Sequence, residues 1–168
     1  QTITGGVQYA HGTLANQLDE NTPAIMLRNL PNLRGQHNGQ NAAAAVAVCH
    51  MLGLSSDAVA SGLETFPGLA HRMQWLGRIG AVGFVNDSKA TNADAAEKAL
   101  QSYDDILWIL GGVAKAGGIE PLARYFPRIR HAYLIGAAAQ QFADTLTAQG
   151  VAHDICGTLD AAIEAAYQ

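Results

Sequence analysis

The stretch of this sequence with the most obvious capacity for chemistry is residues 86–92, Asn-Asp-Ser-Lys-Ala-Thr-Asn. It follows an apolar segment and precedes a helical pattern, and it holds one carboxylate, one ammonium and two hydroxyl side chains. Groups at the start of a helix are well placed to bind anions or ribose hydroxyls, because unpaired backbone N–H groups point there. A capped loop with Asn92 as the helix N-cap is the plainer alternative.

A second cluster, residues 111–118, combines four glycines with Lys115 after the most apolar segment of the chain. It is not a Walker A loop, because no Ser or Thr follows the lysine. The glycines would let a ligand approach the backbone, and Lys115 would offer a positive charge to a carboxylate or phosphate. A glycine-rich turn with a solvated lysine explains the same residues.

A third set consists of residues 37–41, His-Asn-Gly-Gln-Asn, and of His71 and Arg72. The amide of Asn41 could pair with an adenine edge, and the guanidinium of Arg72 could bind phosphate through two parallel hydrogen bonds. Each residue alone also has a structural explanation. Asn41 would be a helix-start residue, His71 a hydrogen-bonded ring and Arg72 a surface ion pair.

From residue 77 onward, short apolar runs alternate with helical patterns, which predicts an α/β fold. The expected strands are residues 83–86, 106–110, 132–135 and 151–155. The expected helices are residues 93–101, 120–128, 137–149 and 159–167, the last capped by Thr158. Strands this apolar imply a parallel, Rossmann-like sheet flanked by helices on both faces. Ligands bind at the carboxyl ends of such strands, where the first two clusters lie.

The first seventy residues have a different pattern. We expect weak strands at residues 1–15 and 24–30 with a turn at 19–23, a helix at 39–52 capped by Asn38, and a helix at 56–65 capped by Ser55 or Ser56. These elements cannot close a large core alone. We therefore predict a domain boundary at residues 67–70, with residues 1–69 being the end of another domain.

Composition excludes several classes of protein. The 168 residues are 49% hydrophobic and 14% charged with a net charge of −4, which indicates a folded chain and argues against nucleic-acid binding. No apolar run reaches the roughly 20 residues of a membrane span. Cys49 and Cys156 have no Cys or His at metal-ligand spacing, so we expect reduced thiols and no metal site in this chain.

Taken together, these segments resemble the Mur ligase family. The matching segments are residues 37–44, 66–73, 84–92 and 110–115, in the order in which the family has them. The string from Asp87 to Asn92 is the most specific, and it is similar to the branch of the family that adds D-glutamate. The resemblance covers about residues 30 to 140.

The resemblance implies that residues 1–69 are the C-terminal part of a central α/β ATP-binding domain and residues 70–168 most of a Rossmann-like C-terminal domain. It implies a cytoplasmic, ATP-dependent amide ligase of peptidoglycan biosynthesis, and hence of cell shape and division. The ligase would join D-glutamate to UDP-N-acetylmuramoyl-L-alanine through an acyl phosphate. The Mg²⁺ ligands and the remaining domains would lie outside this chain, which alone should be inactive.

The resemblance also implies roles for single residues. Asn41 would contact adenine, Asp87 the ribose, Arg72 the ATP phosphates, Lys89 the muramoyl substrate and its developing charge, and Thr91 and Lys115 the side-chain carboxylate of D-glutamate, with His71 in support. Ala114, Gly118 and Ile119 depart from the acidic and aromatic residues that the family usually has around this lysine.

Two other functions fit parts of the same pattern. One is a Rossmann module that binds a nucleotide or an amino acid without catalysis. The other is a different acid–amino-acid ligase of the superfamily, of the folylpolyglutamate type.

Overall fold

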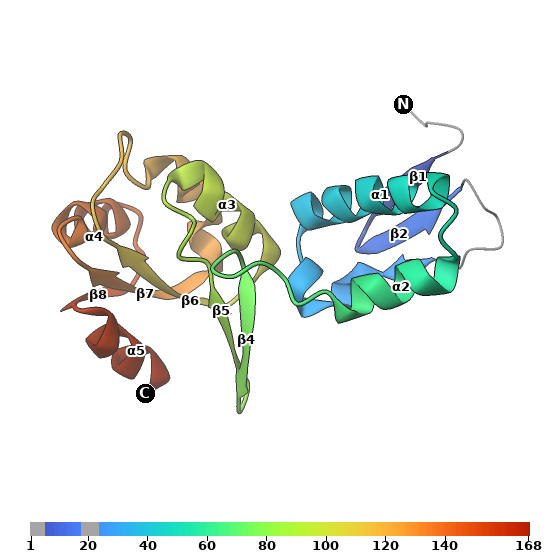
Figure 1. Ribbon diagram of the computed structural model, residues 1–168. Coiled ribbons are helices and arrows are strands. Elements are labelled where there is room, and N and C mark those ends of the chain that lie inside the picture. Colours follow the sequence, from blue (N-terminus) through green and yellow to red (C-terminus); the bar gives the residue numbers. More distant parts are fainter. Residues whose placement is uncertain (1–5, 18–23) are drawn as a thin grey trace. The chain divides into compact units, whose positions relative to one another are not determined.

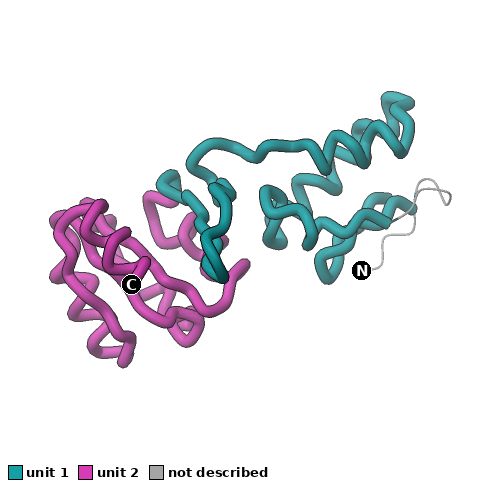
Figure 2. The backbone as a smooth tube through the Cα atoms, turned by 90° about the horizontal axis from the view of Figure 1, so that it is seen from below, with its two compact units in different colours: residues 1–89 teal, residues 90–168 magenta. Residues whose placement is uncertain are grey.

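The computed structural model describes residues 6–17 and 24–168. The chain divides into two compact units, unit 1 (residues 1–89) and unit 2 (residues 90–168), which Figure 2 shows in separate colours. The division that we predicted from the sequence, at residues 67–70, concerns domains of a longer protein and stays a prediction. No helix within the described ranges is both long and apolar enough to cross a membrane.

Unit 1 begins with a small antiparallel sheet covered by helices (Figure 1). The sheet has the order β1 (Val7–Ala10), β2 (Thr13–Asn16), β3 (Ile25–Met26), and short 3₁₀ turns η1 (Leu27–Asn29) and η2 (Pro31–Leu33) lead to α1 (Gln36–Met51) and α2 (Ser56–Thr65). Its buried core consists of Leu14, Leu27, Leu33, Ala42 and Val46. A Cβ at Gly39 would overlap the ring of Tyr9, so glycine lets α1 pack closely on β1.

Three details of unit 1 differ from the prediction. The described part of the single strand expected at residues 1–15 is instead the antiparallel hairpin of β1 and β2. Helix α1 starts after Gly35 and not after Asn38, whose side chain instead donates a hydrogen bond of 3.0 Å to the carbonyl of Arg34. Gly35 has φ of 97°, a conformation that favours glycine and turns the chain into the helix. Of residues 24–30, only Ile25–Met26 forms a strand. The turn predicted at residues 19–23 and the first five residues of the chain lie outside the described ranges.

The segment predicted as a parallel strand at residues 83–86 is part of an antiparallel hairpin instead. Strand β4 (Gln74–Ile79) pairs with β5 (Val82–Asn86), and the two form a sheet of their own. Their connection is the two-residue turn Gly80-Ala81, in which Gly80 has φ of 58°. The hairpin places Asn86, the last residue of β5, opposite Gln74 at the start of β4.

Unit 2 confirms the predicted α/β fold with a parallel sheet flanked by helices. The sheet has the order β6 (Ile106–Gly111), β7 (Ile129–Ile135), β8 (His153–Gly157), all parallel. The helices are α3 (Ala93–Ser102), the 3₁₀ helix η3 (Glu120–Arg128), α4 (Ala139–Ala148) and α5 (Leu159–Tyr167). Figure 1 shows α4 and α5 on opposite faces of the sheet.

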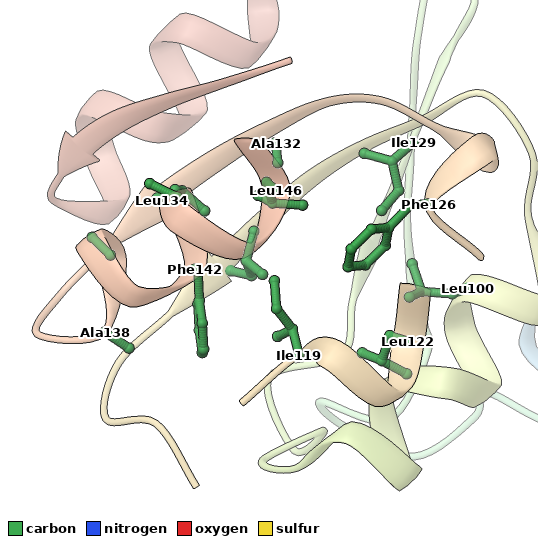
Figure 3. Packing of buried hydrophobic residues seen from close by; sticks show 13 residues of the cluster. Leu100, Ile119, Leu122, Phe126, Ile129, Ala132, Leu134, Ala138, Phe142 and Leu146 are labelled. Atoms are coloured by element: carbon green, nitrogen blue, oxygen red, sulfur yellow. The ribbon is translucent and has the colours of Figure 1, made fainter. Parts of the chain in front are cut away.

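The main core of unit 2 lies on one face of this sheet (Figure 3). Ala132 and Leu134 of β7 are fully buried there, and they pack with Phe142 and Leu146 of α4 and with residues of α3 and η3. Alternate residues of a strand point to opposite faces, so this pattern fixes which face α4 covers. Because β6 and β7 are parallel, their carboxyl ends lie at the same edge of the sheet, next to the glycine-rich residues 111–118.

Two elements of unit 2 deviate from their predicted form for local reasons. Residues Glu120–Arg128 form a 3₁₀ helix, in whose last turn Pro127 lacks the N–H group that an α-helical hydrogen bond would need. Strand β8 starts two residues later than predicted, because the N–H of Val151 bonds the carbonyl of Leu146 and helps to end α4.

Helix α3 is fixed to η3 at several points. The carboxylate of Glu97 accepts hydrogen bonds from Arg124 and, at 2.9 Å, from the hydroxyl of Tyr125. These bonds lower the pKa of Glu97, with that from Arg124 contributing most. At the other end of α3, Arg128 donates to the carbonyls of Leu100 and Gln101. These contacts anchor helix α3 to η3. Thr91, which lies two residues before the start of α3, is therefore attached to a fixed helix.

Candidate functional site

A turn in the left-handed backbone conformation presents Arg72. Its neighbours His71 and Met73 have φ of 63° and 44°, which residues other than glycine rarely adopt. Such a conformation costs about 1–3 kcal/mol per residue and occurs most often at functional sites. The N–H of Arg72 bonds the carbonyl of Leu69 at 3.1 Å, and the guanidinium is exposed.

The loop after β5 holds this turn in place. The N–H of Met73 donates to Oδ1 of Asp87 at 2.9 Å, and the N–H of Lys89 donates to the carbonyl of His71 at 3.0 Å. The side chain of Asn86 lies 3.1 Å from Nδ1 of His71. The structure thus brings four of the predicted site residues together within unit 1: His71, Arg72, Asp87 and Lys89.

The electrostatic setting of Asp87 combines opposing effects. Partial burial raises the pKa of its carboxyl above the ordinary value, and this is the largest effect. The hydrogen bond from Met73 and the positive charges of His37 and Arg72 act in the other direction. The carboxylate is therefore a half-buried acceptor with one oxygen already bonded to the backbone.

Helix α1 contributes to the same side of unit 1. His37, in its first turn, is close enough to act on the charge of Asp87. Asn41 lies four residues later, so it shares a helix face with His37. Asn41 is exposed and belongs to the second turn of α1, not to the first as we predicted. An exposed amide and a half-buried carboxylate on one side of unit 1 suit the base and the sugar of a nucleotide.

Three of the candidate residues are exposed cations without an ion pair. No carboxylate oxygen lies within 4 Å of the cationic groups of Arg72, Lys89 and Lys115 among residues 6–17 and 24–168, although the charge of Arg72 acts on Asp87 over a longer distance. By contrast, four of the seven other Lys and Arg side chains, those of Lys98, Arg124, Arg128 and Arg130, each lie within 4 Å of an Asp or Glu oxygen. Unpaired cations are free to bind an anionic ligand.

Thr91 and Lys115 belong to unit 2. Thr91 is exposed and directly precedes Asn92, whose side chain caps α3 by accepting the N–H of Ala95 at 2.8 Å, as the plainer alternative for residues 86–92 expected. Lys115 is exposed in the loop after β6, where its carbonyl accepts the N–H of Gly118 at 3.0 Å. No hydrogen bond or ion pair joins the side chains of Thr91 and Lys115 in the described part of the chain.

Sequence reasoning gave no individual role to three residues of this site: Gln74, Asn86 and His37. Gln74 accepts the N–H of His71 at 3.0 Å through its side chain, which the sequence could not indicate because β4 was not predicted. Asn86 and His37 lie inside the matched segments but were given no role.

Within the described ranges, no group of three or more His, Cys, Asp or Glu side chains is arranged to hold a metal ion.

The pKa of Asp87 leads to a prediction about stability. A carboxyl whose pKa is raised by folding stabilises the fold below its unfolded pKa, and this contribution is lost as pH rises through the folded pKa. Asp87→Asn keeps an oxygen for the N–H of Met73, so unit 1 should be at least as stable as the wild type at pH 7. Its advantage should shrink towards pH 4, as measured by urea unfolding.

Asp87→Ala is the matched comparison. It leaves the backbone N–H of Met73, a residue only 5% exposed, without its acceptor. We expect it to lower the free energy of unfolding by about 1–3 kcal/mol at both pH values. Equal stability of the Asn and Ala variants would contradict the role of this hydrogen bond.

Comparisons with known proteins match this chain to one family. The family model described as "Mur ligase, glutamate ligase domain" matches residues 71–168. The UDP-N-acetylmuramoylalanine–D-glutamate ligase of Rhizobium johnstonii is 57% identical over 157 residues, which are 92% of this chain and 33% of that protein. The ligase of the same name from Bradyrhizobium diazoefficiens is 52% identical over 96% of this chain and 35% of its own length.

A solved structure shows the same fold. The UDP-N-acetylmuramate-alanine ligase MurC of Thermotoga maritima superimposes with a TM-score of 0.60 at 19% identity, over 74% of this chain and 30% of that one. The chain spans about a third of the length of the curated relatives that it matches. Since the family model covers more than half of its residues, the chain belongs to the Mur ligase family.

Proposed function

We propose that this chain is part of a longer, cytoplasmic ligase that uses ATP to join D-glutamate to UDP-N-acetylmuramoyl-L-alanine in peptidoglycan biosynthesis. Residues 1–69 would be the end of its central ATP-binding domain and residues 70–168 most of its C-terminal domain. The observation that carries the proposal is the turn at Arg72 fixed by Asp87 and Lys89, with both cations unpaired. The names of relatives more than 50% identical support the choice of substrates.

ATP would bind to residues of unit 1. The amide of Asn41 would pair with the adenine edge, the free oxygen of Asp87 would accept a hydrogen bond from a ribose hydroxyl, and Arg72 would bind the phosphates. His37 and Asn41 lie on one face of α1, and His37 acts on Asp87, which supports a shared nucleotide site. ATP supplies the phosphoryl group that activates the carboxylate of the muramoyl substrate. Mg²⁺ would accompany ATP on ligands outside this chain.

Amide formation would then proceed by attack of the D-glutamate amine on the acyl phosphate. The new C–N bond forms, the bond between carbonyl carbon and phosphate oxygen breaks, phosphate leaves, and the amine loses a proton. Lys89 would lie beside the reacting carbonyl and neutralise the charge that develops on it. Thr91 and Lys115 would bind the side-chain carboxylate of D-glutamate and thereby orient the amine.

Phosphate release by the full-length ligase that carries this chain tests the proposal. With ATP, Mg²⁺ and UDP-N-acetylmuramoyl-L-alanine, release is expected with D-glutamate and not with L-glutamate, L-alanine or meso-diaminopimelate. Release with another acceptor or another carboxylate donor, as a folylpolyglutamate-type ligase would show, overturns the substrate assignment. Ligand binding without release under any condition would favour a binding module. The chain alone is expected to be inactive.

A further inference from the structure

The ring of His71 makes one side-chain contact that restricts its chemical state. Its Nδ1 atom lies 3.1 Å from Nδ2 of Asn86, within hydrogen-bond distance. An amide nitrogen donates hydrogen bonds and cannot accept them. Nδ1 must therefore accept, which requires a neutral ring with its proton on Nε2.

A second contact fixes which end of the Asn86 amide faces the histidine. The amide oxygen accepts the backbone N–H of Ser88 at 3.1 Å. Rotating the amide by 180° would place its NH₂ group against the N–H of Ser88 and its oxygen against Nδ1, so the Ser88 contact would bring two donors together. The hydrogen bonds on both sides of the amide thus agree on one orientation.

The backbone of His71 is held independently of the ring. Its N–H donates to the side chain of Gln74 at 3.0 Å, and its carbonyl accepts the N–H of Lys89 at 3.0 Å. Among residues 6–17 and 24–168, the Nε2 atom has no partner, and the side chain is exposed. The ring therefore offers one free donor next to Arg72.

We propose that Asn86 is a positioning residue that holds His71 in its neutral Nε2–H tautomer, so that His71 gives a hydrogen bond to an anionic oxygen of the bound substrates. The nature of the ligand rests on the proposed function. The tautomer does not, because it follows from the hydrogen bonds of Asn86. A neutral Nε2–H group donates a hydrogen bond without carrying a charge. It complements the charges of Arg72 and Lys89 without acting as a base.

Nitrogen NMR of the full-length ligase with ¹⁵N-labelled histidine tests the tautomer directly, and His71→Gln identifies the signals. In the wild type we expect the neutral ring to have an unprotonated Nδ1 and a protonated Nε2. In Asn86→Asp the carboxylate can only accept, so the neutral ring should carry its proton on Nδ1 instead. A protonated Nδ1 in the wild type, or an unchanged tautomer in Asn86→Asp, overturns the proposal.

The pH dependence of activity gives a second readout. Asn86→Asp should lower kcat/KM about tenfold at pH 8.5, the effect of one lost hydrogen bond, because Nε2 has lost its proton. The loss should shrink at a pH low enough to protonate both ring nitrogens, because Nε2 then carries a proton in both proteins. The nearby ionisable groups His37, Arg72, Asp87 and Lys89 are present in both the wild type and Asn86→Asp. Dividing kcat/KM of the variant by that of the wild type at each pH therefore reduces their contribution.

Gln74→Glu is the matched control, because it adds the same charge next to the backbone N–H of His71 without contacting the ring. It should leave the tautomer unchanged, and its activity ratio to the wild type should not recover at low pH. A ratio for Asn86→Asp that is constant with pH would overturn the proposal in favour of a purely structural Asn86. If the ligase releases no phosphate with any acceptor, the proposed function fails, and the NMR result still decides the tautomer.

Discussion

Lys89→Ala is expected to lower kcat/KM of the full-length ligase by about 10²–10³, the usual effect of removing one group that stabilises developing charge. The backbone of residue 89 would stay in place, because its N–H bonds the carbonyl of His71 whatever the side chain. The ammonium has no ion pair in the described part of the chain, so its loss leaves no buried charge behind. Phosphate-release kinetics with saturating ATP and D-glutamate measure the effect.

Lys98→Ala is the control for this prediction. Lys98 is also exposed, but it lies 3.5 Å from Glu97 on α3 and has no proposed role. Its loss should change kcat/KM less than twofold, since exposed ion pairs contribute little. Lys89→Arg should recover part of the activity, because the charge is kept while its position shifts. A Lys89→Ala enzyme with kcat/KM near that of the wild type would remove Lys89 from the reaction.

Elements with strong local signals could be predicted from the sequence. Helices α3 and α5 start where Asn92 and Thr158 predicted their N-caps, because a cap bonds an N–H three residues away and needs no distant partner. Strands β6 and β7 were found as short apolar runs, since strands between covered faces carry few polar residues. Strand β8 contains no buried residue, and it overlaps only in part with the run expected at residues 151–155. These signals are sufficient for the α/β fold class.

Features that depend on partners distant in sequence were missed. Strand β4 contains a polar Gln74, a bulge between Trp75 and Gly77 and a charged Arg78, so it lacks the alternation that marks a strand. It forms because β5 pairs with it. The start of α1 was misplaced because Asn38 is a good cap by residue type, whereas the cap position depends on the backbone of Gly35.

In the candidate site, too, the contacts between residues distant in sequence could not be predicted. The sequence could place a carboxylate and cations on one short segment, but it could not show that Asp87 bonds the N–H of Met73, fourteen residues away. Nor does residue type indicate the left-handed backbone of His71 and Met73, since neither is a glycine. That conformation exists because the loop after β5 supplies the acceptor and donor groups that hold it.

Gly111→Ala is expected to lower the free energy of unfolding of unit 2 by about 4 kcal/mol, from backbone strain and overlap of about 1–3 kcal/mol each. Gly111 has φ of 155°, and a Cβ there would overlap the carbonyl oxygen of Ile135 on the neighbouring strand. That same oxygen accepts the N–H of Gly112 at 3.1 Å, so the methyl group would also break this bond. Urea unfolding followed by Trp108 fluorescence, in a Trp75→Phe background, measures the loss.

Gly112→Ala separates the two effects. Gly112 has φ of 97°, but no other atom lies within 4 Å of a Cβ placed there, so only the backbone strain of about 1–3 kcal/mol applies. Equal losses for the two variants would contradict the overlap with Ile135. A larger loss for Gly111 would mean that the close contact of β6 and β7 at their carboxyl ends requires glycine. The loop that carries Lys115 starts at this contact, so its position depends on the absence of a side chain at residue 111.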